Sequence, residues 1–104
     1  MSTIVPVQEI TVEELHRLGP DVVLIDVREP DEWAQGHVAH ARHVPLGTVP
    51  DRLEEFSGEP TYVMCKVGGR SGRACEFAAA HGRDVVNVAG GMLAWLDAGY
   101  ETVT

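Results

Sequence analysis

The most informative stretch of this sequence is residues 61–71, TYVMCKVGGRS. Its first four residues are apolar, aromatic or β-branched, which predicts a buried strand over residues 61–64. A loop with Cys65 and two glycines follows, and Ser71 is a good N-cap for a helix that ends near Gly82. A strand, a glycine-containing loop and a helix in this order are typical of an α/β fold.

Two further apolar runs predict strands over residues 22–25 and 85–88. Their apolar residues are continuous rather than alternating, which favours strands covered on both faces and therefore a parallel sheet with helices on either side. The helices expected between the strands cover residues 12–18, 48–56 and 92–98, the first with a Thr11–Glu14 capping box and the second with Pro50 in its first turn.

The composition favours one globular domain over residues 1–104, with 44% hydrophobic and 23% charged residues. Two cysteines cannot build a disulfide scaffold, and no apolar run approaches the roughly 20 residues of a membrane helix. The first seven residues lack the basic and apolar segments of a secretory signal, so we expect a cytoplasmic protein.

The net charge of −8 makes nucleic-acid binding unfavourable, because phosphate neutralisation needs clustered lysine and arginine. The bases are unevenly placed, however: Lys66, Arg70 and Arg73 all follow Cys65 within eight positions. Screening over roughly 8 Å leaves these near bases dominant over distant acids. The sequence therefore predicts a site for a small anion beside the thiol.

The 65–71 loop is predicted to be a nucleophilic site. Gly68 and Gly69 allow successive N–H groups to converge, and a helix beginning near Ser71 adds the positive end of its dipole. Arg70 can close over the loop as a planar cation. Such surroundings lower the pKa of Cys65, and the outer sulfur of a persulfide on it would lie within the same ring of donors.

Four segments in order resemble the single-domain rhodanese family, a family of sulfurtransferases. The 65–71 loop resembles its Cys-x-x-Gly-x-Arg-Ser loop. The other three segments are Asp26-Val27-Arg28-Glu29, the stretch from Glu32-Trp33 through Gly36-His37-Val38, and Gly90-Gly91 with Ala94-Trp95 and Ala98-Gly99-Tyr100. His40 and Met92 depart from residues frequent in the family, glycine and tryptophan, and we expect neither of them to touch the loop.

The resemblance implies a rhodanese-like fold with a five-stranded, mainly parallel sheet. It implies transfer of sulfane sulfur through a Cys65 persulfide, from an anionic donor such as thiosulfate to cyanide or a thiol, with no cofactor or metal. The substrate-binding residues would be those of the rest of the loop, supported by Asp26 and Arg28: Lys66, Val67, Gly68, Gly69, Arg70 and Ser71.

Two other functions remain open. One is a cysteine-based phosphatase or arsenate reductase, although those loops place five residues between cysteine and arginine and this chain has four. The other is a rhodanese-like module that only binds or regulates a partner protein. Such modules usually lose the cysteine, which this chain retains.

Several other residues receive structural interpretations. Asp26 and Arg28 suggest an ion pair that braces the loop. Cys75 is expected in the core, as are Trp33 and Trp95, and the Asp31–Glu32 pair on a solvated face. The three-residue spacing of His37, His40 and His43 suggests a metal site, but their loop lacks a recognisable ligand signature, so structural roles are favoured.

Overall fold

The computed structural model describes residues 6–104 and contains a five-stranded sheet in the order β1-β5-β4-β2-β3, with every neighbouring pair parallel. The strands are β1 (Gln8–Ile10), β2 (Val23–Asp26), β3 (Arg42–His43), β4 (Thr61–Met64) and β5 (Val85–Val88). The helices are α1 (Val12–Leu18), α2 (Pro30–Gln35), α3 (Gly69–Ala80) and α4 (Gly91–Asp97), with 3₁₀ helices η1 (Leu46–Asp51) and η2 (Leu53–Glu55). The predicted α/β fold is confirmed.

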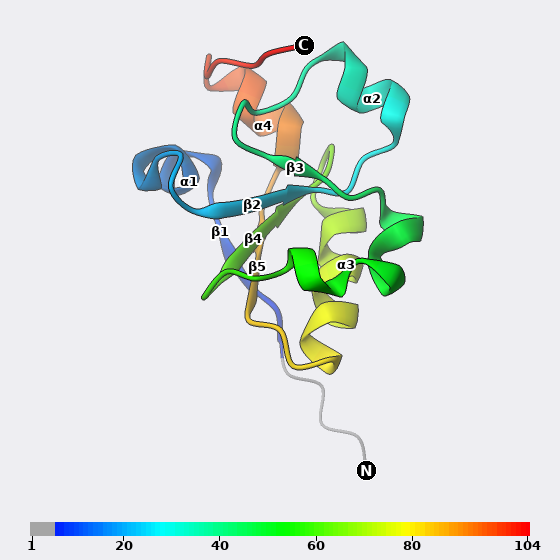
Figure 1. Cartoon of the computed structure of the whole chain (residues 1–104). Helices are drawn as coiled ribbons and strands as arrows, with labels where there is room; N and C mark the ends of the chain where they lie inside the picture. The colour runs from blue at the N-terminus through cyan, green and yellow to red at the C-terminus, as the bar shows by residue number, and fades with distance from the viewer. Residues whose placement is uncertain (1–5) are drawn as a thin grey trace.

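Helices cover both faces of the sheet (Figure 1). Two apolar cores are formed by buried side chains of these elements. On one face, α1 and α4 contribute Val12, Leu15 and Trp95 to a core with the sheet. On the other face, α3 packs its buried side chains over the same strands, together with the 3₁₀ segment. Because the central strands β2, β4 and β5 are buried from both sides, their sequences are apolar without alternation.

The central elements match the sequence-based expectations. The strands over 61–64 and 85–88 are confirmed, and the strand expected over 22–25 lies one residue later. The Thr11–Glu14 capping box begins α1, and α4 lies within one residue of the helix expected at its position. These elements have long apolar runs or complete capping signals, which explains the agreement.

Three elements were not predicted from the sequence: β1, β3 and α2. β1 and β3 are the short edge strands of the sheet, and their sequences, QEI and RH, carry polar side chains that pair with one neighbour only. Helix α2 buries none of its residues, so its sequence has no apolar periodicity.

Two predicted helix details are wrong. The segment expected as one short helix over residues 48–56 forms η1 and η2. The helical segment begins earlier, at Leu46, so Pro50 lies beyond the first turn, at a position whose N–H a continuous α-helix would use. Ser71 is not the N-cap of α3: the helix begins at Gly69, and Gly68 is its N-cap in a left-handed conformation. Ser71 therefore lies in the first turn, where its side chain is free to face Cys65.

Two expectations about localisation depend on what the structure describes. The expected absence of a secretory signal concerns mainly residues 1–5, which lie outside the described part. Within residues 6–104, no helix has the length and apolar character needed to cross a membrane.

Candidate active site

Cys65 lies immediately after β4, at the carboxyl edge of the sheet, and its side chain is fully buried. The Gly68 N–H donates to its Sγ at 3.1 Å, and the Ser71 hydroxyl lies 3.3 Å from the same sulfur. Burial alone would raise the pKa of Cys65. Hydrogen bonds from the Ser71 hydroxyl and from the backbone N–H groups of Ser71, Gly68 and Val67 outweigh burial and lower this pKa. The site therefore favours a thiolate.

The backbone of the 65–71 loop depends on one glycine. Gly68 has φ of +109°, a conformation that L side chains rarely adopt, and this turn carries the chain from β4 into α3. Gly69 was also expected to need glycine's freedom, and this expectation is wrong: it is the first residue of α3 and has no positive φ. A Cβ on Gly69 would meet no atom within 4 Å.

Helix α4 holds the outer side of the loop through its first turn. The Met92 N–H donates to the Cys65 carbonyl at 2.9 Å, and the Leu93 N–H donates to the Lys66 carbonyl at 3.1 Å. The expectation that Met92 does not touch the loop is therefore wrong. Gly91 permits this close approach, because a Cβ there would lie 2.8 Å from the Lys66 carbonyl oxygen.

Arg70 does not close over the loop; its guanidinium binds Glu32 of α2. Its two terminal nitrogens donate to the two carboxylate oxygens at 2.7 and 2.9 Å. The hydrogen bond from Arg70 is the main cause that lowers the pKa of Glu32 to about 2. The interpretation of Glu32 as part of a solvated face is wrong. The useful signal was its motif with Trp33, but nothing local to residue 32 indicated a partner 38 positions away.

Asp26 and Arg28 form a buried ion pair at 2.9 Å, with the Arg28 Nε also donating to both Asp26 oxygens. The remaining guanidinium donors bind the carbonyl oxygens of Glu32 at 3.2 Å and Gly36 at 2.8 Å. The pair thus holds α2 and its end, the segment that presents Glu32. Among the described residues, the side-chain hydrogen bonds that leave the pair go to α2 and Gly36, and none goes to the 65–71 loop.

Asn87 of β5 is a further polar residue at the site, and sequence reasoning identified it only as part of a strand. It is buried, and its Oδ1 accepts from the Ser71 hydroxyl at 2.6 Å. Its Nδ2 donates to the Gly68 carbonyl at 3.1 Å. A polar residue inside the apolar VVNV run was the available signal, since a buried amide needs partners.

The three spaced histidines do not converge. The Trp33 ring stacks between His37, at 3.5 Å between ring centroids, and His43, at 4.6 Å. His40 lies elsewhere, and its buried Nε2 has no hydrogen-bond partner among residues 6–104. Within residues 6–104, no three metal-binding side chains are grouped. Trp33, expected in the core, is half-buried in this stack, whereas Trp95 is a core residue.

The remaining loop and cysteine residues are divided between surface and core. Lys66 and Val67 are exposed beside the buried sulfur, Val67 by 59%. Cys75 is fully buried in the core under α3, and burial raises its pKa to about 12. The two cysteines therefore differ in chemistry, because only Cys65 has surroundings that favour a thiolate.

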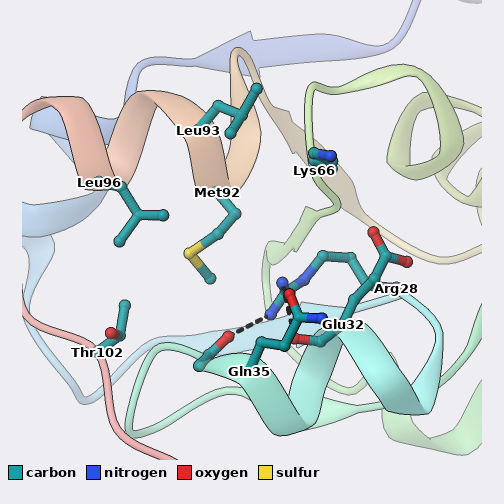
Figure 2. Close-up of a pocket in the computed structure, with 9 residues that line it drawn as sticks. Arg28, Glu32, Gln35, Lys66, Met92, Leu93, Leu96 and Thr102 are labelled. Carbon is teal, nitrogen blue, oxygen red and sulfur yellow. Dashed lines mark hydrogen bonds between the residues drawn. The ribbon is translucent and has the colours of Figure 1, made fainter.

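A cleft of about 210 Å³ lies between α2 and α4, beside Lys66 (Figure 2). Met92, Leu93 and Leu96 of α4 form its apolar wall. Across from them, Arg28 and Gln35 contribute polar atoms. Lys66 follows Cys65 in the chain, and the Met92 N–H binds the Cys65 carbonyl. The cleft therefore adjoins the 65–71 loop.

The chain is thus a small parallel α/β domain with a cysteine-containing loop at the carboxyl edge of its sheet. The sequence model of the family called Rhodanese-like domain matches residues 11–98, and the chain belongs to this family.

Similar proteins are known from several organisms. The chain is 40% identical over 76 residues to YtwF of Bacillus subtilis, covering 72% of this chain and 74% of that protein. It is 38% identical over 77 residues to a sulfurtransferase of Allochromatium vinosum, covering 72% of each. A rhodanese-like domain protein from Staphylococcus aureus superposes with a TM-score of 0.83 at 38% identity, covering 93% of this chain and 99% of that one.

Proposed function

We propose that this chain is a sulfurtransferase that carries sulfane sulfur on Cys65. The observation that carries the proposal is the set of hydrogen-bond donors around Sγ, which lowers the pKa of a buried thiol against the effect of burial. A thiolate is the nucleophilic form of cysteine, and the backbone N–H groups of the loop would stabilise an anionic outer sulfur. The sulfurtransferase of Allochromatium vinosum among its relatives also favours this function.

The transfer takes place in two displacements. The Cys65 thiolate attacks the outer sulfur of a donor such as thiosulfate; the donor's S–S bond breaks, and sulfite leaves with the electron pair. A thiolate or cyanide then attacks the outer sulfur of the persulfide, and the bond between it and Sγ breaks. Cys65 is regenerated as a thiolate, so no external oxidant or reductant is consumed. Two such steps predict ping-pong kinetics.

The proposed acceptor approaches through the cleft beside Lys66. The apolar wall of α4 suits an aliphatic chain, and Lys66 supplies a positive charge without an ion pair among the described residues. The other charges at the cleft are compensated, Arg28 by Asp26 and Glu32 by Arg70. An aliphatic thiol therefore fits this cleft better than a bare inorganic ion.

A phosphatase reaction is less well supported. Its oxyanion would need the guanidinium that follows the cysteine, and here both terminal nitrogens of Arg70 bind Glu32. A module that only binds a partner would have no need of a lowered cysteine pKa. Sulfur uptake and phosphate-ester hydrolysis together distinguish both alternatives from sulfur transfer.

Intact-mass spectrometry after thiosulfate treatment tests the proposed function. We expect a gain of one sulfur atom, its removal by cyanide, and no gain in Cys65→Ala. Cys75→Ala is the matched control, because it removes the other thiol and should keep the gain. Hydrolysis of a phosphate ester without sulfur uptake would support the phosphatase. The absence of both sulfur uptake and hydrolysis would support the binding module.

A further inference from the structure

The Ser71 hydroxyl has one hydrogen and three acceptors within reach. Asn87 Oδ1 lies at 2.6 Å, the Gly68 carbonyl oxygen at 3.2 Å and Cys65 Sγ at 3.3 Å. Ser71 is fully buried and Asn87 is almost fully buried. Bulk water therefore supplies no further hydrogen-bond partners to these side chains. Only one of the three acceptors can receive the hydrogen at a time.

The orientation of the Asn87 amide follows from its other neighbours. Its Nδ2 lies 3.0 Å from Glu9 Oε2 and 3.1 Å from the Gly68 carbonyl oxygen, both of which only accept. The reversed orientation would place the amide oxygen against these two acceptors. Oδ1 is therefore the atom that faces Ser71, and it can only accept the hydroxyl hydrogen.

The Gly68 carbonyl is already occupied. It accepts from Asn87 Nδ2 and from the Gly72 N–H at 3.1 Å, which uses both of its lone pairs. The choice for the Ser71 hydrogen is thus between Asn87 Oδ1 and Cys65 Sγ. The oxygen is nearer, but a thiolate accepts more strongly than a neutral group because it is charged.

We propose, on the basis of the proposed sulfur transfer, that Asn87 is a positioning residue that exchanges the Ser71 hydrogen bond with Cys65 during the reaction. When Cys65 is a thiolate, the hydroxyl turns to Sγ. When the thiolate attacks the donor's outer sulfur, sulfite leaves with the electron pair of the broken bond, Sγ becomes neutral, and the outer sulfur of the persulfide keeps its negative charge. The hydroxyl then returns to Asn87 Oδ1, and no proton leaves Ser71 in either state.

This exchange predicts that Asn87 disfavours the Cys65 thiolate, whereas a residue that only supports the loop would favour the thiolate. Asn87 competes with the thiolate for the hydroxyl and so favours the loaded, neutral Sγ. Without Oδ1, the hydroxyl would stay with the thiolate. If Asn87 only supported the loop through Gly68, its loss would loosen the donors around Sγ and disfavour the thiolate.

The rate of Cys65 alkylation by iodoacetamide against pH separates these two roles. Asn87→Val should lower the pKa of Cys65 by about 0.5 to 1, the value of one competing hydrogen bond. In a Ser71→Ala background, the same Asn87→Val change should leave the pKa where it is. A rise in pKa, or an equal change in both backgrounds, overturns the proposal.

Asn87→Asp provides a second variant if Asn87→Val does not fold. It keeps the acceptor and adds charge, so it should raise the pKa of Cys65 by more in the presence of Ser71 than in Ser71→Ala; an equal rise in both overturns the proposal. Alkylation uses the unloaded protein, so failure of sulfur uptake by the wild type would refute the proposed function without changing this result. Conversely, the thiosulfate-loaded fraction at equilibrium should fall in Asn87→Val.

Discussion

Arg70 and Glu32 form a bidentate ion pair that joins the 65–71 loop to α2, with N–O distances of 2.7 and 2.9 Å. The pair lies close to Cys65, whose negative charge contributes to a raised pKa of Arg70 after the larger effect of Glu32. The arginine near Cys65 is therefore held by a carboxylate of the protein itself. An anionic donor that uses Arg70 must compete with the Glu32 carboxylate for it.

Glu32 should contribute stability that disappears in acid. Its pKa falls from 4.5 to about 2 because Arg70 donates to it, so the contribution is present above pH 4.5 and is lost as pH falls from 4.5 towards 2. The upper limit is about 3 kcal/mol, and the real value is smaller because about a quarter of each side chain is exposed. Chemical unfolding of Glu32→Gln across this range should show a flatter acid dependence. Glu54→Gln, an exposed carboxylate outside the ion pairs of the described residues, should retain the wild-type slope.

Alanine substitutions at the two adjacent loop glycines should have opposite effects on stability. Gly68→Ala places a side chain at φ of +109° and should cost about 1–2 kcal/mol in the free energy of unfolding. Gly69→Ala lies in the first turn of α3, in open space, and should be neutral or stabilising by up to about 1 kcal/mol. Urea unfolding of both variants measures the difference. Equal destabilisation by both would show that the turn does not depend on Gly68.

Leu96 should affect the second half-reaction selectively. Leu96→Asn removes an apolar side chain, half of it exposed, from the cleft wall, and should raise KM for an aliphatic thiol acceptor about fivefold, or roughly 1 kcal/mol. Loading by thiosulfate should be unchanged. Leu18→Asn on α1 is matched in exposure, 47% against 50%, and lies outside this cleft, so it should leave KM unchanged. Equal effects of the two variants would exclude the cleft as the acceptor site.

His40 should make the fold less stable below neutral pH. Burial lowers its pKa below the ordinary value of 6.5, an effect only partly opposed by the charge of Asp21. For a base with a lowered pKa in the folded state, stability is complete above pH 6.5 and declines as pH falls below it. Thermal unfolding between pH 8 and pH 5.5 should show this decline, and His40→Gln should reduce it. An unchanged slope in the variant would assign the pH dependence to other groups.

Sequence patterns were sufficient where a residue's role follows from its neighbours along the chain. The apolar runs predicted β2, β4 and β5, and strand-loop-helix order placed Cys65 at the carboxyl edge of a parallel sheet. Polar edge strands and α2, which has no fully buried residue, were missed because they bury too little to leave an apolar period. Ser71 was recognised as part of the loop, but the predicted N-cap lies three residues after the observed one, Gly68. Ser71 is therefore in the first turn of α3, and its hydroxyl lies within hydrogen-bond distance of the sulfur.

From the order of residues alone came the fold class and the place of Cys65 in a glycine-containing loop, because strands, turns and helix starts depend on interactions within a few positions. Only folding in three dimensions determined which side chain Arg70 binds, which helix holds the Cys65 carbonyl, and which amide competes for the Ser71 hydrogen. Those partners lie on elements far apart in the chain. Their pairing depends on how the sheet brings the ends of its strands together. A local sequence pattern cannot predict which distant segments become neighbours in this way.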